Sequence, residues 1–266
     1  MLTRRIGVRD VEVCRRCGFG RVVAGERPSD YWARTENADE ELGERYWGAR
    51  LPVFLRALAE VARLQGVGRV VDVGGGTAHF TEAALAAGWD AYSYDVSDHA
   101  VAAAAARVGA ERSLAAVPDS MAGTCDVVTL WCVVAHVPDA PAVLGEARRL
   151  LKPNGRLLLS TPNFRFQTAY AALAGRLGRP IDFVAHDHFS HYTPRSLDVL
   201  LAAAGFTATP AYWGVTEDCV LERGLAPVLV PCKRAWNRAA WTLSRAGVPR
   251  YTSELHVKAV PSGPRP

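Results

Sequence analysis

The 266-residue sequence contains no long apolar run, only six cysteines and little excess charge of either sign. Its longest apolar runs, near 127–137 and 225–231, are much shorter than the roughly 18 to 20 residues that span a bilayer, so no transmembrane helix is expected. The first residues carry positive charge, but no apolar stretch of a secretory signal follows them. These absences favour a cytoplasmic protein.

The few cysteines and the balanced charge exclude further classes. Only Cys14 and Cys17 are close in sequence, which argues against a disulfide framework and for free thiols in a reducing compartment. The 31 lysines and arginines are spread among 27 acidic residues, so no nucleic-acid partner is expected. Hydrophobic residues make up 49% of the chain, which predicts a globular protein rather than a disordered or fibrous one.

Strand and helix patterns alternate through most of the chain. Apolar residues at helical spacing predict a helix over 46–64, and Val70–Val73 predicts a buried strand that is closed by three glycines. Further strands are expected at 90–95, 112–116, 126–131 and 156–160, and further helices at 81–87, 99–108 and 140–151. This order predicts an α/β, doubly wound, Rossmann-like fold with a mostly parallel sheet.

The remainder of the chain predicts additions to that sheet. Residues 1–45 form an N-terminal extension with a CxxC turn, and together with the helix over 46–64 they make a helical N-terminal extension. The main domain is expected over 46–266, with cap insertions at about 162–195 and 217–250. Residues 164–192 are expected to be irregular, followed by a helix after Thr193-Pro194, a strand over 206–213, a helix over 229–246, a last strand over 253–260 and a disordered tail over 261–266.

The glycine turn after the first buried strand predicts a ligand site. Gly74, Gly75 and Gly76 permit a ligand to approach the backbone, and Asp95 follows about twenty residues later at the end of the next strand. A carboxylate there can accept two hydrogen bonds from a ribose diol, which favours a nucleoside-like ligand. His79 stands where a dinucleotide fingerprint has a third small residue, so nicotinamide cofactors are disfavoured.

Over 46–260 these motifs resemble the class I S-adenosylmethionine-dependent methyltransferases. The family's first motif matches Asp72, Gly74 and Gly76, with Ala78 in place of a third glycine, and its ribose-binding acid matches Asp95. Residues 125–139 and 151–157 resemble two later motifs. The resemblance implies a seven-stranded sheet with an antiparallel last strand, and a cofactor site made of Asp72, Gly74, Gly75, Gly76, Asp95, Val96, Leu114, Ala115, Trp131 and Cys132.

Residues 186–206 are similar to the ubiquinone-biosynthesis O-methyltransferase-like group, which acts on small molecules. The resemblance implies methyl transfer from S-adenosylmethionine to a small-molecule acceptor, first of all to a hydroxyl of a secondary metabolite or biosynthetic intermediate. C- or N-methylation of a sugar or sugar nucleotide is the alternative within the enzyme class. A cofactor-binding scaffold without activity is the alternative outside it.

Transfer to a hydroxyl needs a base, and histidine suits that role near neutral pH. The expected candidates precede the helix after Pro194 or follow the strand over 126–131: His186, His188, His191 and His136. Any of them can instead have only a structural role. A metal site built from these histidines is not expected.

The sequence leaves alternative roles for two segments. Cys14 and Cys17 resemble one knuckle of a zinc ribbon, but a closed site needs four ligands, so a turn without metal is favoured over zinc. The helix over 229–246 carries basic residues between Trp236 and Trp241. A lid or a contact of a homodimer is favoured there over attachment to a membrane surface.

Overall fold

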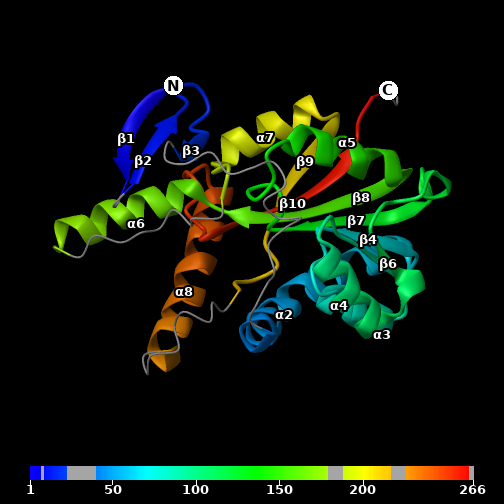
Figure 1. Ribbon diagram of the computed structural model, residues 1–266. Coiled ribbons are helices and arrows are strands. Elements are labelled where there is room, and N and C mark those ends of the chain that lie inside the picture. The colour runs from blue at the N-terminus through cyan, green and yellow to red at the C-terminus, as the bar shows by residue number, and fades with distance from the viewer. Residues whose placement is uncertain (7–8, 23–39, 179–187, 217–225, 264–266) are drawn as a thin grey trace.

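The computed structural model describes residues 1–6, 9–22, 40–178, 188–216 and 226–263 (Figure 1). Its centre is a seven-stranded sheet in the order β6-β5-β4-β7-β8-β10-β9. Only β10 runs antiparallel to its neighbours, β8 and β9. The strands are β4 (Arg69–Val73), β5 (Asp90–Tyr94), β6 (Ser113–Leu114), β7 (Cys125–Trp131), β8 (Leu151–Pro162), β9 (Phe206–Ala211) and β10 (Glu254–Pro261). The expected fold class is confirmed.

Helices cover both faces of the sheet (Figure 1). The strands are rich in β-branched and aliphatic residues, whose side chains alternate between the faces. Val70 and Val127 pack toward α2 and α3, whereas Val71 and Val128 pack toward α5 and α7. The helices are α2 (Glu40–Gln65), α3 (His79–Ala86), α4 (Asp98–Val108), α5 (Ala140–Leu150), α6 (Phe164–Arg176), α7 (Pro194–Ala203) and α8 (Ala226–Arg245).

The strand order reverses beside β4. The chain moves from β4 outward to β5 and β6, then returns to the other side of β4 to form β7. Ligands of open α/β sheets bind at such a point, outside the carboxyl ends of the strands. The glycine turn that follows β4 lies at this edge.

The N-terminal extension differs from the expectation. The expected helix is present, but α2 begins at Glu40 and therefore runs across the predicted boundary at residue 45. Before it, β1 (Leu2–Ile6), β2 (Arg9–Val13) and β3 (Gly20–Val22) form a separate antiparallel sheet that no sequence pattern predicted. These strands are short, and only a few buried residues, such as Ile6 and Val11, anchor them against α6.

Three other segments also depart from the expectation. Residues 164–176, expected to be irregular, form α6, which Asn163 caps by accepting a hydrogen bond from the Arg165 amide. The expected turn at 152–155 lies within β8, where a register shift against β7 accommodates the extra residues. Pro261, placed in the tail, belongs to β10, and residues 264–266 lie outside the described part of the chain.

Candidate functional site

The glycine turn is held to the ends of two neighbouring strands. The amides of Gly74 and Gly75 both donate to the carbonyl of Tyr94, at 2.8 and 3.1 Å. The Gly76 amide donates to Oδ2 of Asp95 at 2.9 Å, and the Ser97 amide donates to its Oδ1 at 3.0 Å. Each carboxylate oxygen thus has one backbone partner and retains capacity for a second donor. Asp95 is therefore fixed in place and remains able to bind a diol.

Two of the three glycines are required by a close neighbour, and the third by its backbone conformation. A Cβ at Gly74 would lie 2.7 Å from Val133 Cγ2, and one at Gly75 would collide with Ser93 Oγ. Gly76 has φ +54°, and among the described residues no atom lies within 4 Å of the place its Cβ would take. The backbone thus leaves open space at Gly76, directly beside the Asp95 carboxylate.

Asp72, on the strand before the turn, is a buried carboxylate with one oxygen that lacks a hydrogen-bond partner among the described residues. Asp72 is 2% exposed, and its Oδ1 accepts a hydrogen bond from Thr129 Oγ1 at 2.6 Å. Among the described residues no donor reaches Asp72 Oδ2, and Ser93 Oγ on the adjacent strand also lacks a partner. Burial raises the pKa of Asp72 to about 7, nearby Asp95 raises it too, and the Thr129 hydrogen bond acts against both. Such a group gains from a cationic ligand.

Two non-glycine residues of the described chain have left-handed backbone, and both flank this edge. Ala78, with φ +63°, caps α3 after the glycine turn, and Cys132, with φ +62°, follows β7. This conformation costs an alanine roughly 1 to 2 kcal/mol, and strain of this kind concentrates at functional sites. Ala78 is fully buried.

The structure separates the remaining predicted cofactor residues into two groups. Val96 is exposed, and Leu114 lies next to Asp95, whose amide donates to the Leu114 carbonyl at 3.1 Å; Ala115 follows it on the surface. The Trp131 indole instead stacks on Phe54 at 4.1 Å within the apolar layer under α2. Cys132 Sγ lies 2.9 Å from Arg50 Nη1, and burial raises the pKa of its thiol.

Three of the four candidate histidines lie together. The rings of His136 and His188 are 4.4 Å apart, and those of His188 and His191 are 5.5 Å apart. The backbone joins the two segments, because the amides of Phe189 and Ser190 donate to the carbonyl of Ala135. His191 is 2% exposed and packs on Phe164, whereas His136 and His188 are half-buried. His186 lies outside the described residues.

The N-terminal sheet holds this histidine segment. Gly20 and His191 exchange two backbone hydrogen bonds, at 2.9 and 2.8 Å. Thr193, which caps α7, donates its hydroxyl to the carbonyl of Cys17 at 2.7 Å. Sequence reasoning missed this contact, because it joins residues about 170 positions apart and no local pattern signals it. The CxxC turn thus braces the segment that carries His188 and His191.

The described residues give the Cys14–Cys17 turn no further metal ligand. Backbone amides of Cys17 and Arg16 donate to the Cys14 sulfur, and together with the Cys17 side chain they lower the pKa of the Cys14 thiol. In the described ranges no group of three or more histidine, cysteine or acidic side chains is arranged to hold a metal ion. The preference for a metal-free turn over a zinc site stays an untested prediction.

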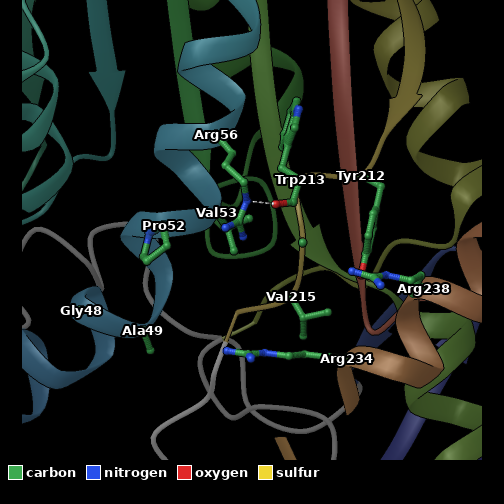
Figure 2. A pocket seen from close by; sticks show the side chains of 11 residues that line it. Gly48, Ala49, Pro52, Val53, Arg56, Tyr212, Trp213, Val215, Arg234 and Arg238 are labelled. Atoms are coloured by element: carbon green, nitrogen blue, oxygen red, sulfur yellow. Dashed lines mark hydrogen bonds between the residues drawn. The ribbon is translucent and has the colours of Figure 1, made fainter. Parts of the chain in front are cut away.

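A second cluster, of arginines, was not predicted as part of the site. Arg56 on α2 and Arg234 and Arg238 on α8 line a pocket with Tyr212 and Trp213 (Figure 2). The Trp213 indole packs against Trp131 at 6.0 Å, which places the pocket next to the end of β7. The only signal in the sequence was the i, i+4 spacing of Arg234 and Arg238.

Across the described residues, no helix is both long and apolar enough to cross a bilayer.

Comparison with known proteins agrees with this arrangement. A family profile described as a methyltransferase domain matches residues 44–211, more than half of the chain. The chain belongs to this methyltransferase family. The resemblance noted in the glycine turn is thereby confirmed.

Curated relatives of this methyltransferase have a name more specific than the description of the family. The ubiquinone biosynthesis O-methyltransferase of Methylococcus capsulatus is 34% identical over 139 residues, covering 48% of this chain and 59% of that protein. The protein of the same name from Xanthomonas axonopodis pv. citri is 33% identical over 186 residues, covering 62% and 76%. The match to the first of these relatives thus spans less than two thirds of its length.

Solved structures share the fold of the methyltransferase. The 1,6-didemethyltoxoflavin-N1-methyltransferase of Burkholderia thailandensis, solved with bound S-adenosylhomocysteine, gives a TM-score of 0.53 at 18% identity, covering 95% of this chain and 98% of that one. The magnesium protoporphyrin IX methyltransferase of Synechocystis gives 0.53 at 16% identity, covering 88% and 98%. At these identities the likeness concerns the fold alone.

Proposed function

We propose that this chain transfers the methyl group of S-adenosylmethionine to a hydroxyl oxygen of a small-molecule acceptor, a secondary metabolite or biosynthetic intermediate. The observation that carries the proposal is the ligand cradle at the end of β4. There an open glycine backbone, a fixed ribose-type carboxylate and a buried carboxylate with an unused oxygen lie together near the carboxyl ends of β4 and β5. The family of the chain supports methyl transfer, and the name of its curated relatives, ubiquinone biosynthesis O-methyltransferase, supports oxygen as the acceptor atom.

The residues present fit the cofactor at both of its polar ends. Asp95 would accept the ribose hydroxyls, since both of its oxygens are oriented by backbone amides. Gly76 would provide the open backbone beside them, and Asp72 Oδ2 with Ser93 Oγ would accept donors from the ammonium end. When bound, S-adenosylmethionine supplies a methyl group on a positively charged sulfur, which is an activated leaving group. The chain therefore has to position the acceptor and remove its proton.

The histidines supply the candidate for proton removal. His136 and His188 face one another at 4.4 Å and are both half-buried, so solutes can reach them. His191 is enclosed by Phe164 and by its bridge to Gly20, which suits it to positioning. In the proposed mechanism an imidazole nitrogen of His188 or His136 would take the hydroxyl proton of the acceptor, whose oxygen would then receive the methyl group that bound S-adenosylmethionine supplies, with S-adenosylhomocysteine as the leaving group. Holding both groups aligned contributes several kcal/mol to the lower barrier.

The proposal is tested by methyl transfer from isotopically labelled S-adenosylmethionine to a panel of acceptors. The panel contains phenols, catechols, amines and sugar nucleotides, each measured with the wild type and with Asp95→Ala. Labelled product from a hydroxylated acceptor, strongly reduced in the variant, is the expected result. Transfer only to nitrogen or carbon would contradict O-methylation, and no transfer to any acceptor by a protein that binds the cofactor would favour the scaffold alternative.

A further inference from the structure

The CxxC turn brings two thiols together outside the cofactor cradle. The Gly18 amide donates to the carbonyl of Cys14 at 2.9 Å, so residues 14–18 form one helix-like turn. Residues three positions apart on such a turn have Cα atoms about 5 Å apart, and disulfides join Cα atoms roughly 4.4 to 6.8 Å apart. The side chains of Cys14 and Cys17 are within hydrogen-bonding reach of each other. A disulfide between them therefore needs only a local adjustment of the turn.

The surroundings of Cys14 make its sulfur reactive. The amides of Cys17 and Arg16 donate to this sulfur, which lowers the pKa of the Cys14 thiol. Hydrogen bonds of this kind favour the thiolate, the form that attacks a disulfide. Cys14 is half-buried, and Arg15 and Arg16 are exposed on the same turn. A negatively charged reagent can thus reach the sulfur and is attracted to it.

The cysteines in the body of the protein have different surroundings. Cys125 in β7 is fully buried, and burial raises the pKa of its thiol to about 11. Burial also raises the pKa of Cys132. Both thiols stay protonated near neutral pH and should react slowly. Cys232 on α8 is exposed, but no other cysteine lies within four positions of it, so its own helix offers it no second thiol.

The turn contacts the segment 188–193, which carries two of the candidate histidines. The Cys17 carbonyl accepts a hydrogen bond from Thr193 Oγ1 at 2.7 Å. A Cβ at Gly18 would lie 3.0 Å from Thr193 Cγ2, so the two segments are closely packed. Gly20 exchanges backbone hydrogen bonds with His191. The sulfurs of a disulfide are about 2.05 Å apart, closer than two thiols in contact, so forming the bond displaces Cys17 from Thr193.

We propose that Cys14 is a site of reversible modification by an anionic low-molecular-weight disulfide, and that Cys17 completes the reaction. The Cys14 thiolate attacks one sulfur of the reagent, which forms a mixed disulfide and releases the other half as a thiolate. The Cys17 thiol loses its proton to solvent and attacks the Cys14 sulfur, which releases the second half. The two cysteines are thereby oxidised to a disulfide, and the reagent is reduced to two thiols. Resting on the proposed function, this bond loosens the segment 188–193 and lowers methyl transfer.

The chemistry is tested on the full chain with glutathione disulfide, followed by peptide mapping in a mass spectrometer. The wild type should lose two hydrogens across Cys14 and Cys17, and dithiothreitol should restore them. Cys17→Ser should retain one glutathionyl group on Cys14, and Cys14→Ser should react at Cys17 at least tenfold more slowly. Serine is similar in size, and Cys17 contacts Thr193 through its backbone, so both variants should fold. Cys232→Ser, the matched control, should react at the turn like the wild type.

The consequence for the site is measured in two ways. Amide hydrogen exchange over 188–193 should be at least threefold faster after oxidation and should recover with dithiothreitol. In the active enzyme kcat should fall at least threefold, while the affinity for S-adenosylhomocysteine stays within twofold. Glutathione disulfide should change neither exchange nor kcat in Cys14→Ser.

Three results would overturn the inference. They are modification of Cys125 or Cys132 ahead of the turn, reaction of Cys17 in Cys14→Ser as fast as that of Cys14 in the wild type, and oxidation that leaves exchange over 188–193 or kcat unchanged. The mass and exchange measurements need neither cofactor nor acceptor, which separates the two proposals. Methyl transfer by a protein whose turn resists the reagent contradicts only this inference. Oxidation of the turn in a protein without methyl transfer contradicts the proposed function and leaves the modification site standing.

Discussion

The two halves of the site are built in different ways. The proposed cradle for the cofactor comes from one continuous stretch, 72–97, in which a strand, a glycine turn, a helix and a second strand follow in order. The proposed acceptor side instead combines Gly20, His136 and the segment 188–193. One half thus depends on local conformation, and the other depends on contacts between segments far apart in the chain.

This difference predicts how each half responds to mutation. In the cradle, a change should alter ligand affinity with little effect elsewhere, because its hydrogen bonds stay within the glycine turn and the ends of two adjacent strands. On the acceptor side, a change at a contact between segments should affect stability and turnover together, since the same contacts hold the fold and the histidines.

The largest effect is expected at the histidine pair. His188→Ala should lower kcat on the acceptor identified in the panel about a hundredfold or more, the usual contribution of a positioned base. His99→Ala is the matched control, because His99 is exposed on α4 away from the cluster, and it should leave kcat unchanged. If His188→Ala and His136→Ala both retain turnover within threefold, neither imidazole is the base.

The next effect concerns the brace from the N-terminal sheet. A Cβ at Gly20 would lie 2.5 Å from Cε1 of Phe164, so Gly20→Ala should lower the free energy of unfolding by about 1 to 3 kcal/mol, as overpacking does. Gly175→Ala in α6, where nothing described lies within 4 Å, should instead raise it by up to about 1 kcal/mol. Urea unfolding measures both. Equal stability of Gly20→Ala and the wild type would show that Gly20 of the N-terminal sheet is not packed tightly against Phe164.

Two glycines offer a test of the cradle for which the expected effect is smaller. Gly76 and Gly66 both have positive φ and open space around a Cβ, so alanine at either should cost about 1 to 2 kcal/mol in backbone strain. Only Gly76→Ala should weaken binding of S-adenosylhomocysteine, by tenfold or more, because its methyl group enters the ligand space. Calorimetry distinguishes the two. Equal affinity in both variants would mean that no ligand approaches Gly76.

The smallest predicted effect is the pH dependence of cofactor affinity. Burial raises the pKa of Asp72 to about 7, so this carboxyl is protonated below that pH in the free protein and ionised above it. An ammonium group prefers the ionised form, and the affinity for S-adenosylhomocysteine should therefore rise between pH 6 and 8. Asp72→Asn should remove this rise.

Thr129→Val sharpens the same test. The Thr129 hydroxyl lowers the pKa of Asp72, so its loss should move the midpoint to higher pH. The raised pKa also implies that the free energy of unfolding decreases as pH rises from about 4 to 7, because the unfolded carboxyl ionises first. An affinity that is independent of pH in the wild type would contradict a role for Asp72 at the ammonium end.

The sequence predicted the strands and the turn of the proposed cradle well because their signals are local. The spacing of Asp72, three glycines and Asp95 requires only a strand, a turn and a second strand, and the structure has all three in register. The start of the helix after Thr193-Pro194 was also predicted, and Thr193 caps α7 there. The seven strands and the antiparallel β10 followed from the family resemblance.

The acceptor side was predicted only in part, because its partners are distant in sequence. The histidines were named as candidates, yet the proximity of His136 to His188 depends on the Ala135 carbonyl binding the loop at 189–190. The β1–β3 sheet has strands of three to five residues, too short for a clear period. Trp131 was expected beside the cofactor, but strand alternation directs its indole into the layer with Phe54.

The central claim is that the turn after β4 is a cofactor cradle whose ribose ligand is Asp95. It is tested most directly by calorimetric titration of wild type, Asp95→Ala and the exposed control Asp119→Ala with S-adenosylhomocysteine. Micromolar binding by the wild type and by Asp119→Ala, with Asp95→Ala weaker by tenfold or more, about 1.4 kcal/mol, is the predicted result. No binding by a folded wild type, or equal binding by all three proteins, would contradict it.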